Sequence, residues 1–304
     1  MASYPVAGKT VFITGAARGI GAETARRLAA KGANVALVGL EPDELERVAS
    51  QCGANAAWFD TDVTDWDALE RAASGTVERF GGIDVVMANA GIASAGLVKS
   101  TDPDAWERVV EVNLFGVWRT VRTCLPHVIE RKGYILPVAS LAAAAHSPVM
   151  SAYSASKAGV EAFTDALRGE IAHHGVAVGC AYFSWIGTDM VSGGDASAAG
   201  GILRGRMKGP LAKTYPVSVA VDAVEKGIES RARRVMAPSW IRFMFVMRDF
   251  LSVITDKQVA DVMPEVERVV EADIAARGAQ ATAPVGAGGE ADSRLRAGTG
   301  VPAP

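Results

Sequence analysis

The sequence contains little of what marks a metalloprotein, a secreted protein or a membrane protein. It has three cysteines and four histidines in 304 residues, and their spacing fits neither a zinc site nor a disulfide framework. We therefore predict no metal site and reduced thiols, which suits a cytoplasmic location. No run of about 18 uninterrupted apolar residues is present, so no membrane-spanning helix is expected.

An excess of charge of either sign is missing too. The chain has 31 basic and 34 acidic residues, for a formal net charge of −3, so nothing favours a nucleic-acid partner. Apolar residues, in contrast, are abundant, at 49% of the chain. A chain of this length and composition can bury the core of one large α/β domain.

Short apolar runs alternate with helical patterns over most of the chain. The expected strands cover residues 10–14, 34–40, 56–60, 83–88, 134–139, 176–182 and 234–237. Helical patterns separate them, the longest at 103–132 and 151–174. Strands separated by helices form βαβ units, and right-handed crossovers place helices on both faces of a parallel sheet. The sequence thus predicts a single doubly wound, Rossmann-like α/β domain over residues 1–240.

Beyond residue 240 the pattern changes. Residues 241–276 predict a hydrophobic helical extension, whereas residues 277–304 are rich in Ala, Gly and Pro and have no apolar periodicity. Such a composition is typical of a disordered tail, and its removal is expected to leave activity and melting temperature nearly unchanged. A stretch rich in Gly, Ser and Ala at 189–213 predicts a mobile loop.

A glycine-rich turn joins the first expected strand to the first helix. Three glycines at this spacing permit a tight turn, close approach of the backbone to a pyrophosphate, and close packing of the helix on the strand. The free N–H groups and the positive end of the helix dipole then favour phosphate. The turn predicts a dinucleotide site that includes Gly15, Arg18, Gly19, Ile20 and Gly21.

A second group of polar residues points to acid–base chemistry. Tyr153 and Lys157 are four residues apart in a helical stretch and share a face. Ser140 follows the fifth strand, and Asn113 lies among apolar neighbours in the long helix before that strand. A free tyrosine has a pKa of about 10. A nearby ammonium group stabilises the phenolate, and lowering the pKa by about three units needs roughly 4 kcal/mol.

Together these motifs resemble the short-chain dehydrogenase/reductase family over residues 8–240. The resemblance implies an NAD(P)-dependent oxidoreductase that moves a hydride between the nicotinamide and a small-molecule carbonyl or alcohol. Its catalytic residues would be Asn113, Ser140, Tyr153 and Lys157. Its cofactor-binding residues would be Gly15, Arg18, Gly19, Ile20, Gly21, Glu41, Asp62, Val63, Asn89, Ala90, Gly91, Tyr153, Lys157, Ile186 and Thr188.

The resemblance also implies a role for each catalytic residue. Tyr153 would act as the acid/base, and Ser140 would hold the substrate oxygen beside it. Lys157 would bind the nicotinamide ribose and stabilise the phenolate, and the positive charge of an oxidised nicotinamide would add to this stabilisation. Asn113 would anchor a water that links the lysine to solvent.

Two departures from the family pattern concern the cofactor. Phe183 and Ser184 replace the Pro-Gly that usually follows the sixth strand, and Gly39 stands where NAD-dependent relatives place an Asp. Glu41 could accept from a ribose 2′-hydroxyl and would repel a 2′-phosphate, whereas Arg18 could pair with that phosphate. The sequence favours NAD over NADP.

Two other functions are alternatives. One is a catalytically silent dinucleotide-binding sensor or scaffold, against which the presence of all four catalytic positions argues. The other is an epimerase or dehydratase, for whose sugar-nucleotide domain the chain has little room. The family further implies a homo-dimer or homo-tetramer through the helices at 103–132 and 151–174.

The segment 238–254 is unusually rich in Phe and Met. Its apolar face has three interpretations. It is a helix packed at a subunit interface or against the core, or a wall of a substrate pocket that suits a bulky apolar substrate. The third interpretation is a helix at a membrane surface, with arginines at its polar edge.

Overall fold

A parallel β-sheet forms the centre of the molecule in the computed structural model, which describes residues 4–298 apart from the side chains of Ala198 and residues 251–258. Six strands pair in the order β3-β2-β1-β4-β5-β6. They are β1 (Thr10–Thr14), β2 (Asn34–Gly39), β3 (Ala56–Asp60), β4 (Val85–Ala88), β5 (Tyr134–Pro137) and β6 (Ala177–Val178). A bridge between Val138 and Ala181 continues the sheet to β7 (Cys180–Phe183), which pairs with β8 (Arg234–Ala237).

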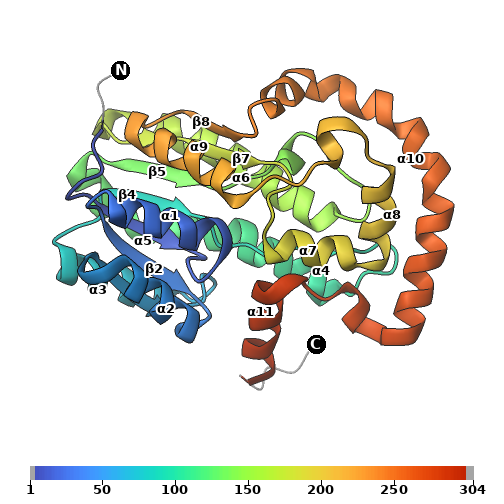
Figure 1. The fold of residues 1–304 in the computed structure, drawn as a ribbon, viewed down its shortest axis with the longest axis horizontal. Helices are drawn as coiled ribbons and strands as arrows, with labels where there is room; N and C mark the ends of the chain where they lie inside the picture. Colours follow the sequence, from blue (N-terminus) through green and yellow to red (C-terminus); the bar gives the residue numbers. More distant parts are fainter. Residues whose placement is uncertain (1–3, 299–304) are drawn as a thin grey trace.

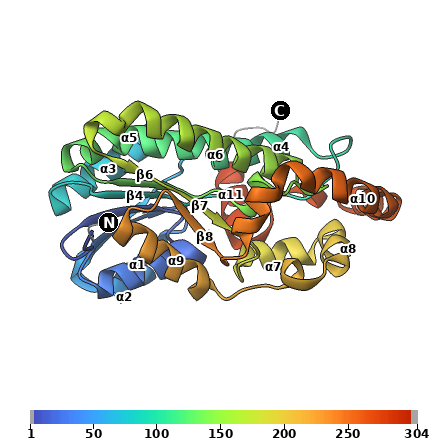
Figure 2. The ribbon, with the colours of Figure 1, turned by 90° about the horizontal axis from the view of Figure 1, so that it is seen from above.

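Helices cover both faces of this sheet, as Figures 1 and 2 show. One face carries α1 (Gly19–Ala30), α2 (Pro42–Cys52) and α9 (Val217–Ser230). The other carries α3 (Trp66–Phe80), α4 (Pro103–Val110), α5 (Gly116–Arg131) and α6 (Ser151–Ile171). The prediction of a doubly wound α/β fold is confirmed.

The two layers of helices bury two hydrophobic cores because successive side chains of a strand point to opposite faces. In β1, Ile13 packs into the core on the side of α1, which includes Leu28. Its neighbour Phe12 packs into the core on the side of α5, which includes Val121. Strands buried on both faces read as continuous apolar runs, which is why the sequence revealed them.

The strand order positions a binding crevice. The chain passes from β3 back across the sheet to β4, so the connections that follow β1 and β4 leave in opposite directions. In sheets of this kind, ligands bind at this switch point, outside the carboxyl ends of the strands. The glycine-rich turn after β1 and the Asn89 turn after β4 both lie there.

The stretch predicted to be a mobile loop at 189–213 is helical instead. It contains α7 (Asp189–Ala196), α8 (Ala198–Arg206) and a short 3-10 turn, Gly209–Ala212. Small residues hide the helical pattern, but α8 packs Ile202 and Leu203 against a cluster that includes Val266 of the next long helix. Tertiary contacts therefore outweigh the weak helix propensity of this composition.

The C-terminal region contains two helices. The first, α10 (Ile241–Arg277), covers the predicted hydrophobic extension and runs along one edge of the molecule in Figure 1. A 3-10 turn, Gly278–Thr282, leads to α11 (Gly286–Gly298). The prediction of a disordered tail from residue 277 is wrong for residues 277–298. Arg277 ends α10, and α11 packs beside α7 and buries Asp292 and Ala291. Residues 299–304 of that prediction lie outside the described residues.

The start of α10 has one buried and one exposed face. Ile241 and Phe245 are buried in the core, and the ring of Phe245 lies 4.5 Å from that of Tyr182. Phe243, Val246 and Phe250 are exposed. Packing against the core, one of the three interpretations, thus holds for the buried face. The membrane-surface interpretation stays a prediction.

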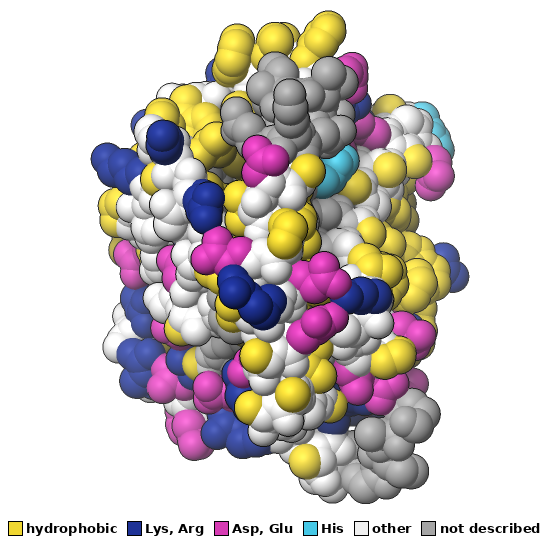
Figure 3. All heavy atoms as spheres, turned by 90° about the vertical axis from the view of Figure 1, so that its right-hand side faces the viewer, with side chains coloured by type: hydrophobic (Ala, Val, Ile, Leu, Met, Phe, Trp, Pro, Cys, Tyr) yellow, Lys and Arg dark blue, Asp and Glu magenta, His cyan; other side chains and the backbone are white. Residues whose placement is uncertain are grey.

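The side of the molecule that carries α10 is mixed in character. In Figure 3, apolar side chains gather towards the top, and charged side chains of both signs are interspersed over the middle. Among the described residues, we find no helix with the length and hydropathy needed to cross a bilayer.

Candidate active site

The glycine-rich turn after β1 has the shape that a diphosphate group requires. Gly15 has a φ of +65°, and a Cβ there would lie 2.9 Å from the Cα of Ala90. Gly19 has a φ of +56° and begins α1. A side chain at either position would strain the backbone, and a Cβ at Gly19 would lie 3.2 Å from Cγ2 of Thr188. Because Arg18 at the N-cap makes no side-chain cap bond, the first N–H groups of α1 stay available to an anion.

Asn89 holds this turn against the end of β4. Its Nδ2 donates to the carbonyl oxygens of Thr14 at 3.0 Å and of Gly15 at 3.2 Å. The Thr14 hydroxyl accepts from the backbone N–H groups of Asn89 and Ala90. The turn is therefore rigid before any ligand arrives, which lowers the cost of binding.

A cavity of about 230 Å³ runs from this turn along the carboxyl ends of the strands. Nearly all residues that the sequence singled out as cofactor-binding or catalytic line this cavity. They are Gly15, Arg18, Gly19, Ile20, Glu41, Asp62, Val63, Asn89, Ala90, Gly91, Ser140, Tyr153, Lys157, Ile186 and Thr188. Gly21 and Asn113 are outside the lining. Gly21 instead lets α1 approach the turn, since a Cβ there would lie 2.3 Å from the carbonyl oxygen of Gly15.

Asn113 lies behind the cavity and is fully buried. It sits in a π-helical turn, Glu111–Phe115, between α4 and α5. Its Oδ1 accepts from the N–H of Ile92 at 2.8 Å, and its Nδ2 donates to the carbonyl oxygen of Ile92 at 2.9 Å. Insertions of this kind are frequent at functional sites. Asn113 thus fixes the chain that follows Gly91 at the edge of the cavity.

Lys157 and Tyr153 lie on one face of α6, as their spacing predicts. The Nζ of Lys157 donates to the carbonyl oxygen of Val138 at 2.9 Å and lies 5.7 Å from the centre of the Tyr153 ring. Burial lowers the pKa of Lys157 to about 8. This lysine therefore remains largely protonated near neutral pH, although its charge is costly to bury.

The protein groups around Tyr153 raise its pKa, whereas the lowered pKa expected from the sequence includes the positive charge of an oxidised nicotinamide. Burial raises this pKa, and a hydrogen bond with Ser140 offsets the rise only in part. Lowering the pKa of Tyr153 requires a further positive charge within the cavity.

A second cavity, of about 180 Å³, adjoins the first. The two cavities share Ser140, Tyr153, Phe183, Ser184, Met190 and Val191. The rest of the second cavity is largely apolar, with Leu203 and Met207 on one side. This lining comes from α7, α8 and the neighbouring loops, whereas the sequence suggested the segment 238–254 as a pocket wall.

The side chain of Arg204 in the second cavity is fully engaged. Its guanidinium pairs with Asp195 at 2.9 Å and donates to the carbonyl oxygen of Leu211 at 3.1 Å and to the hydroxyl of Thr214 at 2.8 Å. It also lies 4.2 Å from the centre of the Trp185 ring. Its charge is thus neutralised within the protein.

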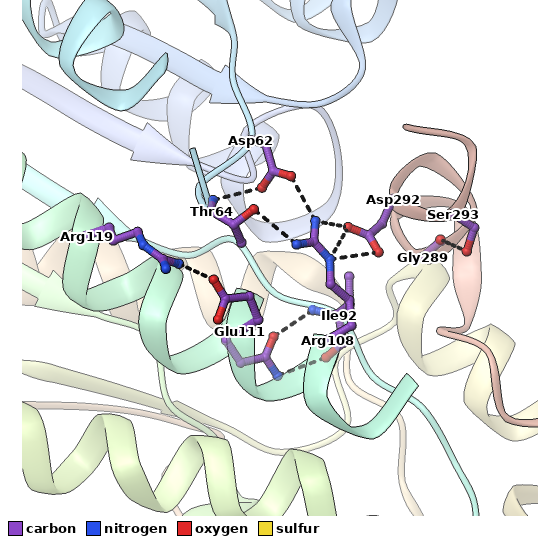
Figure 4. A network of polar contacts seen from close by, with 10 residues as sticks. Asp62, Thr64, Ile92, Arg108, Glu111, Arg119, Gly289, Asp292 and Ser293 are labelled. Atoms are coloured by element: carbon purple, nitrogen blue, oxygen red, sulfur yellow. Dashed lines mark hydrogen bonds and ion pairs between the residues drawn. The ribbon is translucent and has the colours of Figure 1, made fainter. Parts of the chain in front are cut away.

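Sequence reasoning missed two charged residues at the first cavity. Asp292 of α11 lines the cavity, and Arg108 of α4 joins it to Asp62 (Figure 4). Arg108 looks like a surface residue in the sequence, and Asp292 falls in a region whose composition resembles a disordered tail. Neither residue lies in a local sequence pattern that indicates a place at the site.

The fold and the site define a dinucleotide-dependent oxidoreductase with a serine and a tyrosine at the meeting point of two cavities. Comparison with known proteins agrees with this class. The sequence profile of the short chain dehydrogenase family matches residues 9–197. This chain therefore belongs to the short chain dehydrogenase family, and the prediction of an NAD(P)-dependent oxidoreductase is confirmed at that level.

Three similar proteins illustrate the range of the family. 2,3-Dihydro-2,3-dihydroxybenzoate dehydrogenase of Bacillus subtilis is 34% identical over 230 residues, 72% of this chain and 88% of that protein. (-)-trans-Carveol dehydrogenase of Rhodococcus erythropolis is 35% identical over 204 residues, 61% of this chain and 74% of that protein. The 3-ketoacyl-(acyl-carrier-protein) reductase of Brucella melitensis, solved with NADH, is 26% identical with a TM-score of 0.68, over 76% of this chain and 97% of that chain.

Proposed function

We propose that this enzyme transfers a hydride between NAD(H) and a neutral, apolar secondary alcohol or carbonyl compound, with Tyr153 as acid/base. The observation that carries the proposal is the position of Ser140 and Tyr153 in the walls of both cavities. A substrate in the second cavity and a nicotinamide in the first cavity would both contact these two side chains.

The first cavity suits the dinucleotide group by group. The backbone of the turn at Gly15 and Gly19 would hold the diphosphate, and Asp62 and Val63 would hold the adenine. Asn89, Ala90 and Gly91 would lie beside the ribose and nicotinamide, with Ile186 and Thr188 opposite. The bound nicotinamide supplies the hydride acceptor or donor and, when oxidised, a positive charge.

The residues of the chain handle the proton. The Ser140 hydroxyl would donate a hydrogen bond to the substrate oxygen and orient it towards Tyr153. In reduction, the Tyr153 phenol donates its proton to that oxygen, and in oxidation the phenolate accepts it. Lys157 would stabilise the phenolate and bind the ribose, and Asn113 would position the water that connects Lys157 to solvent.

Charges near the adenosine ribose favour NAD over NADP. The guanidinium of Arg18 pairs with Glu41 and, at 3.1 Å, with Asp189. Arg18 is thus not free for a 2′-phosphate, which would instead meet two carboxylates. Glu41 lines the cavity and can accept from a 2′-hydroxyl.

The second cavity favours an uncharged substrate. Its apolar lining favours the binding of a ligand with apolar surface. The charge of Arg204 is already neutralised by Asp195. A carboxylate buried there would be left without a partner cation among the described lining residues. Of the named relatives, the carveol dehydrogenase acts on a compound of the neutral kind, whereas a dihydroxybenzoate carries a carboxylate.

A substrate panel read at the nicotinamide absorbance tests the proposal. It pairs NAD and NADP with neutral alicyclic alcohols and with hydroxycyclohexanecarboxylates of similar size. We expect turnover with NAD and a higher kcat/KM for the neutral members. A preference for the carboxylates would reject the substrate class, and a tenfold preference for NADP would reject the cofactor. Binding of NADH without turnover of any alcohol or ketone would favour the silent sensor or scaffold.

We also propose that the enzyme is a homo-dimer or homo-tetramer. Phe115, which ends the π-helical turn, and Trp118 of α5 are 45% and 41% exposed. Large aromatic side chains at a surface suit a subunit contact. Light scattering coupled to size-exclusion chromatography should give a mass of two or four chains, and a monomer at micromolar concentration would contradict this proposal.

A further inference from the structure

The C-terminal helix α11 closes one end of the cofactor cavity. Gly288, Ala291 and Asp292 contribute to the same lining as Glu41 and Asp62. This end of the cavity is the one proposed above for adenosine, so the inference rests on the proposed function. The family match ends at residue 197, long before this helix begins.

A buried ionic contact fastens α11 to the cavity wall (Figure 4). The guanidinium of Arg108 lies between two carboxylates that come from distant parts of the chain. Its Nε and Nη2 donate to Asp292 at 3.0 and 2.6 Å, and Nη2 also donates to Asp62 at 2.8 Å. The Asp292 side chain is 2% exposed. Charged groups buried in this way are held firmly as long as both partners are present.

The same arginine links α11 to the residue proposed for adenine. The second oxygen of Asp62 accepts from the backbone N–H of Thr64 at 2.8 Å, and Nη1 of Arg108 donates to the Thr64 hydroxyl at 3.0 Å. Arg108 thus orients Asp62 and holds Asp292 at once. If Asp292 were released from Arg108, both α11 and Asp62 would be held less firmly at the cavity.

The helix itself is poorly suited to stand alone. Four of its 13 residues are glycine, and a helix of this length is marginal in water even with a favourable composition. Its start is tethered, since the N–H of Val285 donates to the carbonyl oxygen of Ala93 at 2.8 Å and the N–H of Asp102 donates to the Thr282 hydroxyl at 3.2 Å. A tethered helix with weak intrinsic stability, fixed by a buried ion pair, can open about its start.

We propose that α11 is a cover over the adenosine end of the cofactor cavity, latched by the contact between Arg108 and Asp292. The cover lies over bound cofactor and slows its release. Cofactor exchange requires the latch to open and α11 to swing away from the cavity.

The test compares two variants that each remove one carboxylate charge from α11. Asp292→Asn breaks the latch, whereas Glu290→Gln changes an exposed residue two positions away. NADH dissociation is measured by stopped-flow fluorescence with an excess of NAD as competitor. We expect Asp292→Asn to release NADH at least tenfold faster than the wild type and to bind it more weakly, whereas Glu290→Gln matches the wild type.

A second measurement on the wild type needs no variant and is independent of folding defects. Amide hydrogen exchange of residues 286–298 is followed with and without NADH, and we expect NADH to slow it. Equal NADH release from the two variants, tighter binding by Asp292→Asn, or exchange unaffected by NADH would each overturn the cover while leaving the proposed function intact. Failure of the wild type to bind NADH would overturn the proposed function and the cover together.

Discussion

The two walls of the cofactor cavity are built in different ways. The inner wall consists of the turns that leave strands β1 to β5 and of the face of α6 that carries Tyr153 and Lys157. Within this wall, the glycine-rich turn takes its shape from its own residues and the adjoining strands. The outer wall is α11, which has weak helix propensity and is positioned by Asp292, Val285 and Thr282 through contacts with distant residues. One cavity thus combines a wall specified by local sequence with a wall specified by tertiary contacts.

The inner wall should be the site of chemistry, and Tyr153→Phe tests this most severely. The change removes only the ionisable oxygen, and positioned acid–base catalysis is worth about 10² to 10⁴ in rate. We expect kcat to fall by that factor while the affinity for NADH stays within about twofold of the wild type. Retention of the wild-type rate would remove Tyr153 from the mechanism.

Lys157 should be needed for activity, although burial of its charge lowers the free energy of unfolding. Its pKa falls from 10.5 to about 8 in the folded protein, a difference of about 3 kcal/mol. Below pH 8 the folded and the unfolded chain both carry the proton, so the full cost of burying the charge is present. As the pH rises from 8 to 10.5, the folded chain loses the proton first and the cost disappears.

The variant Lys157→Met makes this cost measurable. It should be inactive, yet without cofactor it should unfold at a higher denaturant concentration than the wild type at pH 7. The gain is up to about 3 kcal/mol, reduced by loss of the hydrogen bond to Val138. The difference should shrink between pH 8 and 10, and a difference independent of pH would show that Lys157 is not buried as a cation.

Removal of residues 278–304 addresses the outer wall directly. A disordered tail could be removed without effect, as the sequence suggested. The structure leads to the opposite expectation, because Arg108 loses a buried partner and the cavity opens to solvent. We expect the free energy of unfolding to fall by about 1 to 2 kcal/mol and the melting temperature to fall by a few degrees. An unchanged melting temperature in a calorimetric scan would show that α11 contributes nothing to the folded state.

The smallest expected effect concerns cofactor choice at the junction of the two walls. Glu41→Gln removes one of the two carboxylates that pair with Arg18, so the guanidinium becomes more available to a 2′-phosphate. We expect the ratio of NADP to NAD affinity to rise by about tenfold, the equivalent of about 1.4 kcal/mol. Glu44→Gln, on the exposed start of α2, is the matched control. An equal ratio of NADP to NAD affinity in the two variants would show that Glu41 does not contact the ribose.

Residues with a strong local pattern were predicted well. The apolar runs of β1 and β4 revealed the sheet, and the four-residue spacing of Tyr153 and Lys157 placed both on one face of α6. Helices α7, α8 and α11 were missed for a physical reason. Their Gly, Ser and Ala residues carry no apolar periodicity. Packing of α7 against α8 and α11, and of α8 against α10, supplies the stability that their propensity lacks. A cytoplasmic location stays a prediction from the sequence.

The sequence by itself determined the doubly wound sheet and the glycine turn, and it predicted the catalytic positions, because these depend on residue type and spacing over short distances. Only the tertiary structure decided that burial raises the pKa of Tyr153 and that a second, apolar cavity meets the first at Ser140. It alone joined Arg108 to Asp62 and Asp292. Burial and contacts between residues more than 40 positions apart produce these features, and no local pattern in the chain encodes them.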